Sequence, residues 1–340
     1  MKTFLRSLIL TGLWLHTLAC STSSQDAHLS VSKLVKPQQY RWLKGTFTPA
    51  DPSRVERIVI FGDSLSDTGR LHARTKFFYP PEVYWHSRAS NGPIWIDYVA
   101  NAAGWKVSHH AVAGATAGSE SWLKSLVIPP VSDQVEDYLD DESNRDHRRD
   151  LAVIWIGPNN YFSEPEANEV SGVMQEIEAA VAALHQAGFG MIALGTMPEL
   201  GGLPAHQKPS AQAEDKALRV WTAAHNKALK RLMDTLKRNY RQANLFFFDA
   251  FQINQQTVDR PLDFGFRNIL QACYKGDYLG RMEGKAEFCP DPSAYKFWDE
   301  VHPNSKMHCY YAVQFLADLQ EAGLIRGYRK EDALHRCQKL

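Results

Sequence analysis

The chain has 340 residues, of which 44% are hydrophobic and 22% are charged, as in ordinary globular proteins. Its 38 Lys and Arg residues balance its 38 Asp and Glu residues, so the formal net charge is zero. A neutral chain lacks the excess positive charge that captures nucleic acids or anionic bilayers without specificity, which argues against a nucleic-acid partner. The length permits one large α/β domain or two smaller ones.

Residues 1–20 predict an export signal. A basic start is followed by an apolar run over residues 7–18, which is too short to span a bilayer. Two kinds of processing remain open: cleavage at the small residues near Ala19, and cleavage before Cys20 with lipid attachment to its sulfur. We therefore expect a protein that is secreted or held at the outer membrane or cell surface.

The rest of the chain predicts one α/β domain over residues 54–327, followed by a C-terminal tail of residues 328–340. Before this domain, residues 21–53 are polar and have no sustained periodicity, as expected of a tether or a strap. Within it, short apolar runs alternate with helical patterns, which predicts a mostly parallel five-stranded sheet between two helical layers. The predicted strands are residues 57–62, 106–114, 151–157, 190–197 and 244–251, and helical patterns begin near Pro93, Val170, Lys216 and Asn304.

The carboxyl ends of parallel strands carry the ligand site of such a sheet, and candidate nucleophilic residues fall there. Ser64 follows the first strand in a tight turn that can expose its hydroxyl and leave its backbone N–H free. Far along the chain, Asp299 lies three residues before His302, so one loop can present an imidazole together with the carboxylate that orients it. These three residues are the parts of a serine hydrolase.

Two further candidates lie at the same sheet edge and can donate hydrogen bonds to a developing oxyanion. Asn159 follows the strand at residues 151–157 and offers a side-chain amide. Gly114 follows the weak second strand and offers a backbone N–H. Donors of these two kinds stabilise the negative charge that forms on a carbonyl oxygen under nucleophilic attack.

The motifs FGDSLSDTG, AVAGATAG, GPNN and DEVHP, in this order, resemble the four sequence blocks of the GDSL or SGNH family of serine esterases. The resemblance covers roughly residues 57–325. SNGPIWIDYVA and FWDEVHPN are similar to the bacterial branch of phospholipases A, lysophospholipases and glycerophospholipid:cholesterol acyltransferases. The resemblance implies a three-layer α/β/α, flavodoxin-like fold, a bacterial origin and a lipid substrate.

Carried over to this chain, the resemblance implies a role for each candidate. Ser64 would be the nucleophile, His302 the general base and Asp299 the residue that holds the imidazole. The backbone N–H groups of Ser64 and Gly114 and the side-chain amide of Asn159 would form the oxyanion hole. This chemistry requires no cofactor and no metal ion.

The chain departs from the family pattern in two blocks. Many relatives carry an aspartate where this chain has Asn160, so we expect weaker support for the loop of Asn159. Many members of the branch carry Asn and Gly where this chain has His109 and Ala113, which puts the exact shape of the Gly114 loop in question. Neither change touches the predicted triad.

The cysteines also bear on the fold, because disulfides form in the oxidising compartments that an exported chain reaches. Apart from Cys20 there are four, Cys273, Cys289, Cys309 and Cys337, which allow three connectivities. The sequential pairing, Cys273 with Cys289 and Cys309 with Cys337, closes the shortest loops. The resemblance implies the first of these bridges, because the bacterial branch has a disulfide-closed loop before its catalytic histidine.

Two segments have more than one interpretation. The aromatic segment after the nucleophile, Phe77, Phe78, Tyr79, Tyr84 and Trp85, fits an exposed rim that receives acyl chains and equally fits an aromatic core under a long loop. The charged run over residues 140–150 is interpreted as a solvated connection before the third strand.

The sequence therefore predicts an exported serine esterase that acts on phospholipids or lysophospholipids taken from a membrane surface, with cholesterol as an alternative acyl acceptor. The loop between Cys273 and Cys289 immediately precedes the predicted catalytic loop, and we expect it to act as a lid opened by reduction or by an activating protease. A carbohydrate or small-ester deacetylase and a non-catalytic lipid-binding surface lipoprotein are the alternatives.

Overall fold

The structure is a computed structural model that describes residues 43, 48–49, 54–76, 79–118, 122–162, 165–276, 278 and 287–340. The predicted export signal, most of the N-terminal polar segment, and Phe77 and Phe78 of the aromatic segment lie outside the described residues. No helix in the described ranges combines the length and the apolar character that a membrane crossing requires.

A parallel sheet of five strands forms the centre of the fold, as predicted. Its order is β3-β2-β4-β5-β6, and every neighbouring pair is parallel. The chain therefore places its second sheet strand on one side of the first and all later strands on the other, which is the flavodoxin-like order. The strands are β2 (Arg57–Gly62), β3 (Lys106–His109), β4 (Asp150–Trp155), β5 (Met191–Gly195) and β6 (Asn244–Phe248).

The inner strands β2, β4 and β5 are largely apolar because both faces of the sheet are covered, whereas the edge strand β3 has the sequence KVSH and is only partly buried. In β2, Ile58 and Ile60 pack into the core on one face, and Val59 and Phe61 pack into the core on the other. Side chains alternate between the two faces of a strand, so a continuous apolar run is what a doubly covered sheet requires.

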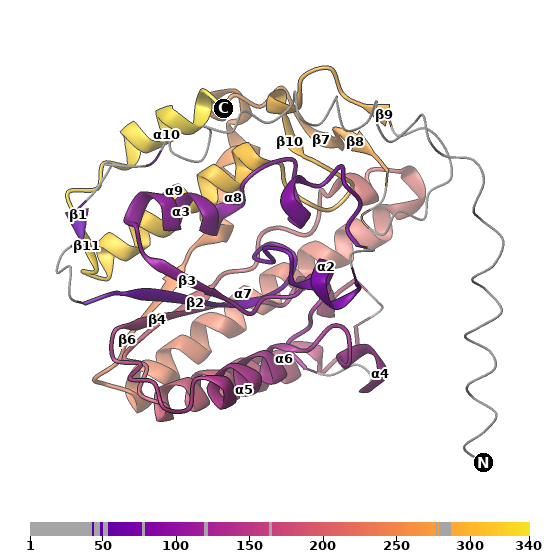
Figure 1. The fold of residues 1–340 in the computed structure, drawn as a ribbon. Helices are drawn as coiled ribbons and strands as arrows, with labels where there is room; N and C mark the ends of the chain where they lie inside the picture. The colour runs from indigo at the N-terminus through magenta and orange to yellow at the C-terminus, as the bar shows by residue number, and fades with distance from the viewer. Residues whose placement is uncertain are drawn as a thin grey trace, which may run out of the picture.

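Helices cover the two faces in separate layers, which confirms the predicted α/β/α architecture (Figure 1). One layer contains α3 (Trp95–Ala103), α8 (Ala250–Asp259), α9 (Ser305–Glu321) and α10 (Lys330–Gln338). The other contains α5 (Val131–Asp141), α6 (Glu169–Gln186) and α7 (Gln212–Asn239). The short helices are α2 (Arg70–Arg74) and α4 (Trp122–Ser125), and the 3₁₀ turns are η2 (Trp85–Ser87), η3 (Pro158–Asn160), η4 (Pro204–His206), η5 (Pro209–Ala211), η6 (Pro261–Phe264) and η7 (Pro292–Ala294).

Several predicted segments differ from the structure. The strand expected over residues 106–114 ends at His109. The run 140–150 is not wholly solvated, because Asp150 is fully buried and accepts hydrogen bonds from Arg145 Nε at 2.7 Å and from the His147 ring at 3.0 Å. The strand expected over residues 244–251 ends at Phe248, since the Asp249 side chain accepts from the N–H of Gln252 and begins α8.

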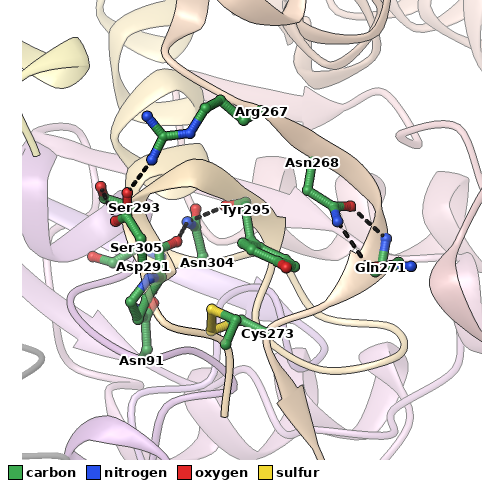
Figure 2. The surroundings of a disulfide bond; sticks show 12 residues. Asn91, Arg267, Asn268, Gln271, Cys273, Asp291, Ser293, Tyr295, Asn304 and Ser305 are labelled. Carbon is green, nitrogen blue, oxygen red and sulfur yellow. Dashed lines mark hydrogen bonds and ion pairs between the residues drawn. A yellow bond between two sulfur atoms is a disulfide. The ribbon is translucent and has the colours of Figure 1, made fainter.

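Three small two-stranded sheets lie outside the central one. β7 (Asn268–Ala272) pairs in parallel with β10 (Tyr295–Phe297), β8 (Tyr274–Lys275) pairs with β9 (Glu287–Phe288), and β1 (Thr48–Pro49) pairs with β11 (Ile325–Arg326). β10 leads directly into the loop of Asp299, so the β7–β10 pair supports one side of the candidate site. Figure 2 shows this region beside the Cys273 bridge, where Asn304 is bonded to Tyr295 and Arg267 to Asp291.

Both disulfides follow the sequential pairing. Cys273 is bonded to Cys289, and Cys309 is bonded to Cys337. The second bridge joins α9 to α10, so the segment taken as a C-terminal tail is a helix that packs on the core through Ala333 and Cys337. The N-terminal polar segment also contributes to the packing, since Leu43 is completely buried in the same core.

Candidate active site

Ser64, His302 and Asp299 lie in one line of hydrogen bonds. His302 Nε2 is 2.9 Å from Ser64 Oγ, and His302 Nδ1 is 2.7 Å from Asp299 Oδ2. A carboxylate can only accept, so Nδ1 carries the ring proton, and Nε2 is the nitrogen that accepts from the Ser64 hydroxyl. The neutral imidazole is thus held in the tautomer that removes a proton from a serine hydroxyl.

Asp299 is a buried carboxylate whose two oxygens have different partners. Oδ1 accepts from the backbone N–H groups of Val301 and His302 at 2.8 and 2.6 Å, which closes the loop between the two side chains. Burial opposes ionisation of Asp299, but the charge attraction of His302 and these hydrogen bonds outweigh it and lower the pKa of the carboxyl. Asp299 is therefore negatively charged beside the imidazole at neutral pH.

The turn after β2 presents Ser64 with its backbone N–H unused. Gly62 is required before it, because a Cβ at this position would collide with the carbonyl oxygen of Trp155 in β4. The next residues fold back on Asp63, whose carboxyl accepts from Leu65 N at 3.0 Å and whose carbonyl accepts from Ser66 N at 3.0 Å. Neither bond involves Ser64 N, which has no hydrogen-bond partner among the described residues.

The loop of Gly114 is fastened to the loop of Ser64 by Asp67. Asp67 Oδ2 accepts from Ala113 N at 2.8 Å and from Leu71 N at 3.0 Å, while Oδ1 accepts from Gly69 N and Arg70 N. The Asp67 side chain thus accepts hydrogen bonds from backbone N–H groups, and it fixes the position of Ala113, the residue before Gly114. Gly114 has φ +85°, a conformation that side chains disfavour, and its N–H has no partner among the described residues.

Asn159 lies at the carboxyl end of β4, in η3, beside the Gly114 loop. Its amide donates one hydrogen bond to the carbonyl of Ala115 at 2.9 Å, which orients the side chain and leaves the second N–H of the amide for a ligand. Ser64, Gly114 and Asn159 all line one cavity together with His302. The structure therefore brings together every residue that the sequence nominated for the triad and the oxyanion hole.

The cavity has a volume of about 370 Å³, and Ser64 lies on its wall. Asp63, Lys124 and Glu199 lie on its wall beside His302, but most of its surface is apolar. The apolar lining comes from Leu65, Leu71, Ala113, Ile128, Pro158, Phe162, Pro198, Leu200, Leu203, Tyr278, Val301, Pro303 and Tyr311. A cavity of this shape accepts a hydrocarbon chain whose reactive group is presented to Ser64.

Comparison with known families gives the same assignment as the geometry. Residues 58–314 match the model of the GDSL-like lipases and acylhydrolases. The chain belongs to this family. As a GDSL hydrolase it is an enzyme that acts by acyl transfer. The match spans the five strands of the central sheet and includes both Ser64 and Asp299.

Individual relatives of this GDSL hydrolase are bacterial and plant proteins. It is 30% identical to a phosphatidylcholine-sterol acyltransferase of Aeromonas hydrophila, over 74% of this chain and 86% of the relative. It is 27% identical to a thermolabile hemolysin of Vibrio parahaemolyticus, over 78% of this chain and 64% of that relative's length. A solved structure of a lipolytic G-D-S-L family member from Veillonella parvula superposes with a TM-score of 0.46 at 12% identity, covering 78% of this chain and 99% of that chain.

The GDSL hydrolase departs from one expectation about its third block. Asn160 was expected to weaken the support of the Asn159 loop, but it is bonded on both sides. Its carbonyl oxygen accepts from Ala117 N at 3.0 Å, and its amide donates to Glu169 Oε1 at 2.8 Å. The asparagine therefore ties the loop to the Gly114 segment and to α6.

Of the described part of the aromatic segment, Tyr84 is buried in the core, whereas Tyr79 and Trp85 are half-buried. Tyr84 is 2% exposed, and its hydroxyl reaches Asp299, a contact that the sequence reading missed. Tyr278, from the loop closed by the Cys273 bridge, was also missed: its ring lies 4.8 Å from the His302 ring and lines the cavity. Tyr84 and Tyr278 lie far from Asp299 and His302 in the sequence, so only the fold reveals these contacts.

Four further histidines take no part in the hydrogen bonds that join Ser64, His302 and Asp299. His225 is buried and bonded to the Tyr161 hydroxyl at 3.0 Å, and His308 accepts from Trp95 N. Burial lowers the pKa of His225 to about 4 and that of His308 to about 3, so both are neutral. His110 is bonded to Ser108 at 2.9 Å at the end of β3, and burial lowers the pKa of both His109 and His110 to about 4.

Proposed function

We propose that this GDSL hydrolase is an exported lipid acylhydrolase that acts as a phospholipase A or lysophospholipase and can transfer the acyl group to a sterol. The observation that carries the proposal is the apolar cavity of about 370 Å³ that opens at Ser64. The name of the Aeromonas relative, a phosphatidylcholine-sterol acyltransferase, supports the same substrate class.

In the proposed reaction, Ser64 Oγ attacks the ester carbonyl carbon while His302 Nε2 takes the hydroxyl proton. The carbonyl oxygen becomes negatively charged and is stabilised by the N–H groups of Ser64 and Gly114 and by the Asn159 amide. His302 then returns the proton to the leaving alcohol oxygen as the bond between the carbonyl carbon and that oxygen breaks. An acyl ester on Ser64 remains.

The second half of the reaction decides between the two activities. His302 Nε2 takes a proton from water or from a sterol hydroxyl, whose oxygen attacks the acyl carbon. The bond between this carbon and Ser64 Oγ then breaks, and His302 returns the proton to Ser64 Oγ. Water gives a fatty acid, whereas the sterol gives a sterol ester. Both acceptors use the same residues, so the balance depends on how well the apolar cavity excludes water. The apolar lining favours the larger acceptor.

We also propose that the loop between Cys273 and Cys289 is a lid over this site. Tyr278 of this loop lies on the cavity wall against His302, and the bridge fixes both ends of the loop. The loop carries the exposed basic residue Lys275 and, in its undescribed part, Arg281 and Lys285, which are sites for a trypsin-like activating protease. Verified cleavage between the two cysteines should raise the turnover of long-chain lipids, and unchanged turnover would reject the lid.

The proposed function is tested by product analysis. The mature protein and its Ser64→Ala variant are incubated with phosphatidylcholine or lysophosphatidylcholine vesicles that contain cholesterol. We expect fatty acid, with or without cholesteryl ester, from the wild type, and a loss of several orders of magnitude in the variant with its thermal unfolding unchanged.

Other results of this experiment lead to different functions. If short acetyl esters are cleaved and long-chain lipids are not, the protein is a small-ester deacetylase. If lipid is bound equally by both proteins and no ester is cleaved, it is a lipid-binding protein that retains the fold of an enzyme.

A further inference from the structure

Tyr84 makes a buried hydrogen bond to the candidate catalytic acid. Its hydroxyl donates to Asp299 Oδ2 at 2.6 Å, across 215 residues of sequence. Oδ2 is also the oxygen that accepts from His302 Nδ1 at 2.7 Å. Two donors therefore share the one carboxylate oxygen that faces the imidazole.

The ring of Tyr84 is fixed by packing on the opposite side. It makes edge contacts with the rings of Tyr278 at 4.9 Å and Tyr274 at 5.8 Å, and Tyr274 stacks on Trp298, the neighbour of Asp299. The Tyr84 ring is 2% exposed in a cluster that includes Cys273. The hydroxyl is consequently held in place and excluded from solvent.

The hydroxyl of Tyr84 acts only as a donor in this position. Burial and the charge of Asp299 both raise the pKa of Tyr84 above its ordinary value, so the phenol is protonated at neutral pH. A donor that is always present removes part of the negative charge on the oxygen to which it binds. It also prevents rotation of the carboxylate away from His302.

We propose that Tyr84 is a positioning residue that acts through Asp299, fixing the orientation of the carboxylate and moderating its pull on the His302 imidazolium. The inference rests on the proposed roles of Ser64, His302 and Asp299. Tyr84 does not line the cavity, so it affects the chemical step and not the binding of the acyl chain.

Removal of this hydroxyl has two expected consequences. Without the hydroxyl, the negative charge on Asp299 Oδ2 interacts with His302 alone, so the imidazole stays protonated to higher pH. The acid limb of the kcat/KM profile therefore moves to higher pH. The less constrained carboxylate orients the ring less well, so kcat falls while KM changes little.

Other titratable groups face the same pair and must be considered in the profile. Asp63 and His308 face His302, and Tyr278 faces Asp299. Burial raises the pKa of Asp63 to about 7 and lowers that of His308 to about 3. These groups are present in both wild type and variant, so the difference between the two profiles belongs to Tyr84.

The experiment compares Tyr84→Phe with Tyr310→Phe. Tyr310 is also fully buried and donates from its hydroxyl, at 2.7 Å, to the carbonyl of Phe264, away from the cavity. For Tyr84→Phe we expect kcat on a soluble ester to fall by roughly 10-fold to 100-fold, the loss typical of a hydrogen bond to a charged group. Tyr310→Phe should lower the melting temperature without changing kcat or the profile.

A double-mutant cycle with Asp299→Asn distinguishes a positioning role of Tyr84 from a general loss of rigidity in the protein. If Tyr84 acts through Asp299, the substitution Tyr84→Phe should cost much less in the Asp299→Asn background than in the wild type. An unchanged pH profile of Tyr84→Phe, or an equal loss in both backgrounds, would overturn the proposal. Failure of the proposed function is seen separately, as activity that survives Ser64→Ala.

Discussion

Asn160 accepts a hydrogen bond from the backbone N–H of Ala117 at 3.0 Å, joining the loop after β4 to the loop that carries Gly114. The same side chain donates to Glu169 Oε1 at 2.8 Å at the start of α6. An aspartate could retain the first bond but not the second, because it would place a carboxylate against the carboxylate of Glu169. Asparagine at this position and glutamate at position 169 are therefore a matched pair.

This pairing predicts that Asn160→Asp, which restores the residue of many relatives, destabilises this chain. The lost hydrogen bond and the repulsion between two carboxylates should lower the free energy of unfolding by about 1–2 kcal/mol at pH 8. Urea unfolding of Asn160→Asp and of the double variant Asn160→Asp, Glu169→Gln measures the effect. The double variant should recover most of the loss, and an equal loss in both would refute the pairing.

Asn159→Ala should impair the chemical step and leave binding almost intact. Its amide is the side-chain donor of the proposed oxyanion hole, and removal of one such donor lowers kcat by about 100-fold to 1,000-fold in serine hydrolases. Steady-state kinetics on a soluble ester measure kcat and KM. Asn254→Ala is the matched control, because Asn254 lines the same cavity but is bonded to the Tyr311 hydroxyl; a similar loss in kcat in both variants would contradict the role of Asn159.

Asp63 should make the protein less stable as the pH rises. Burial raises its pKa from 3.8 to about 7, and its Oδ2 has no hydrogen-bond partner in the part of the chain that the structure describes. The folded state therefore binds the proton more tightly than the unfolded state. The stability linked to this proton is fully present below the unfolded pKa and is lost as the pH rises through about 7.

Asp63→Asn removes this dependence while keeping an oxygen for the N–H of Leu65. The free energy of unfolding of the variant, relative to wild type, should increase by up to about 4 kcal/mol between pH 4 and pH 8. Urea unfolding at several pH values measures the difference. A constant difference across that range would mean that Asp63 is ionised in the folded protein.

Leu126 should help the enzyme to engage a lipid surface. Leu126 and Val127 follow α4 and are 65% and 39% exposed. In the sequence they lie between Lys124 and Ile128, and both of these residues line the cavity. Insertion of an exposed apolar side chain next to the cavity would favour transfer of substrate from a bilayer. Leu126→Asp should therefore lower the hydrolysis of vesicle lipids by roughly 10-fold, the value of one buried leucine, and leave soluble short-chain esters unaffected.

Leu262→Asp is the control for this prediction. Leu262 is 74% exposed in η6 and does not line the cavity, so its substitution adds the same charge at a remote position. If both variants keep wild-type activity on vesicle lipids, or if both lose it equally, Leu126 does not contribute specifically to engagement of the lipid surface. Vesicle flotation of the Ser64→Ala forms measures binding without turnover.

The sheet and the candidate site could be predicted from sequence because their signals are local. Every strand of the central sheet except β3 is a short, largely apolar run that ends near small or polar residues, and Ser64 and Asn159 follow two such runs closely. Asp299 and His302 are three residues apart, so one loop contains both. Since parallel strands end at one edge of the sheet, local positions were sufficient to place these residues together.

Features that depend on distant contacts could not be predicted. Tyr84 meets Asp299 only because the loop before α3 crosses the loop before α9, and no spacing in the sequence encodes that approach. α5 was missed for a different reason. Its buried residues Val131, Gln134, Val135 and Tyr138 have helical spacing, but the core face includes a glutamine bonded to the backbone of Gly62, and acidic residues surround it.

The bond between Ser64 and His302 connects residues that are 238 positions apart, one near the beginning of the domain and the other near its end. A growing chain that ends before His302 contains a serine with no partner to activate it. Acyl transfer by the predicted triad therefore cannot begin until most of the domain has been synthesised, because His302 lies in the loop directly before α9.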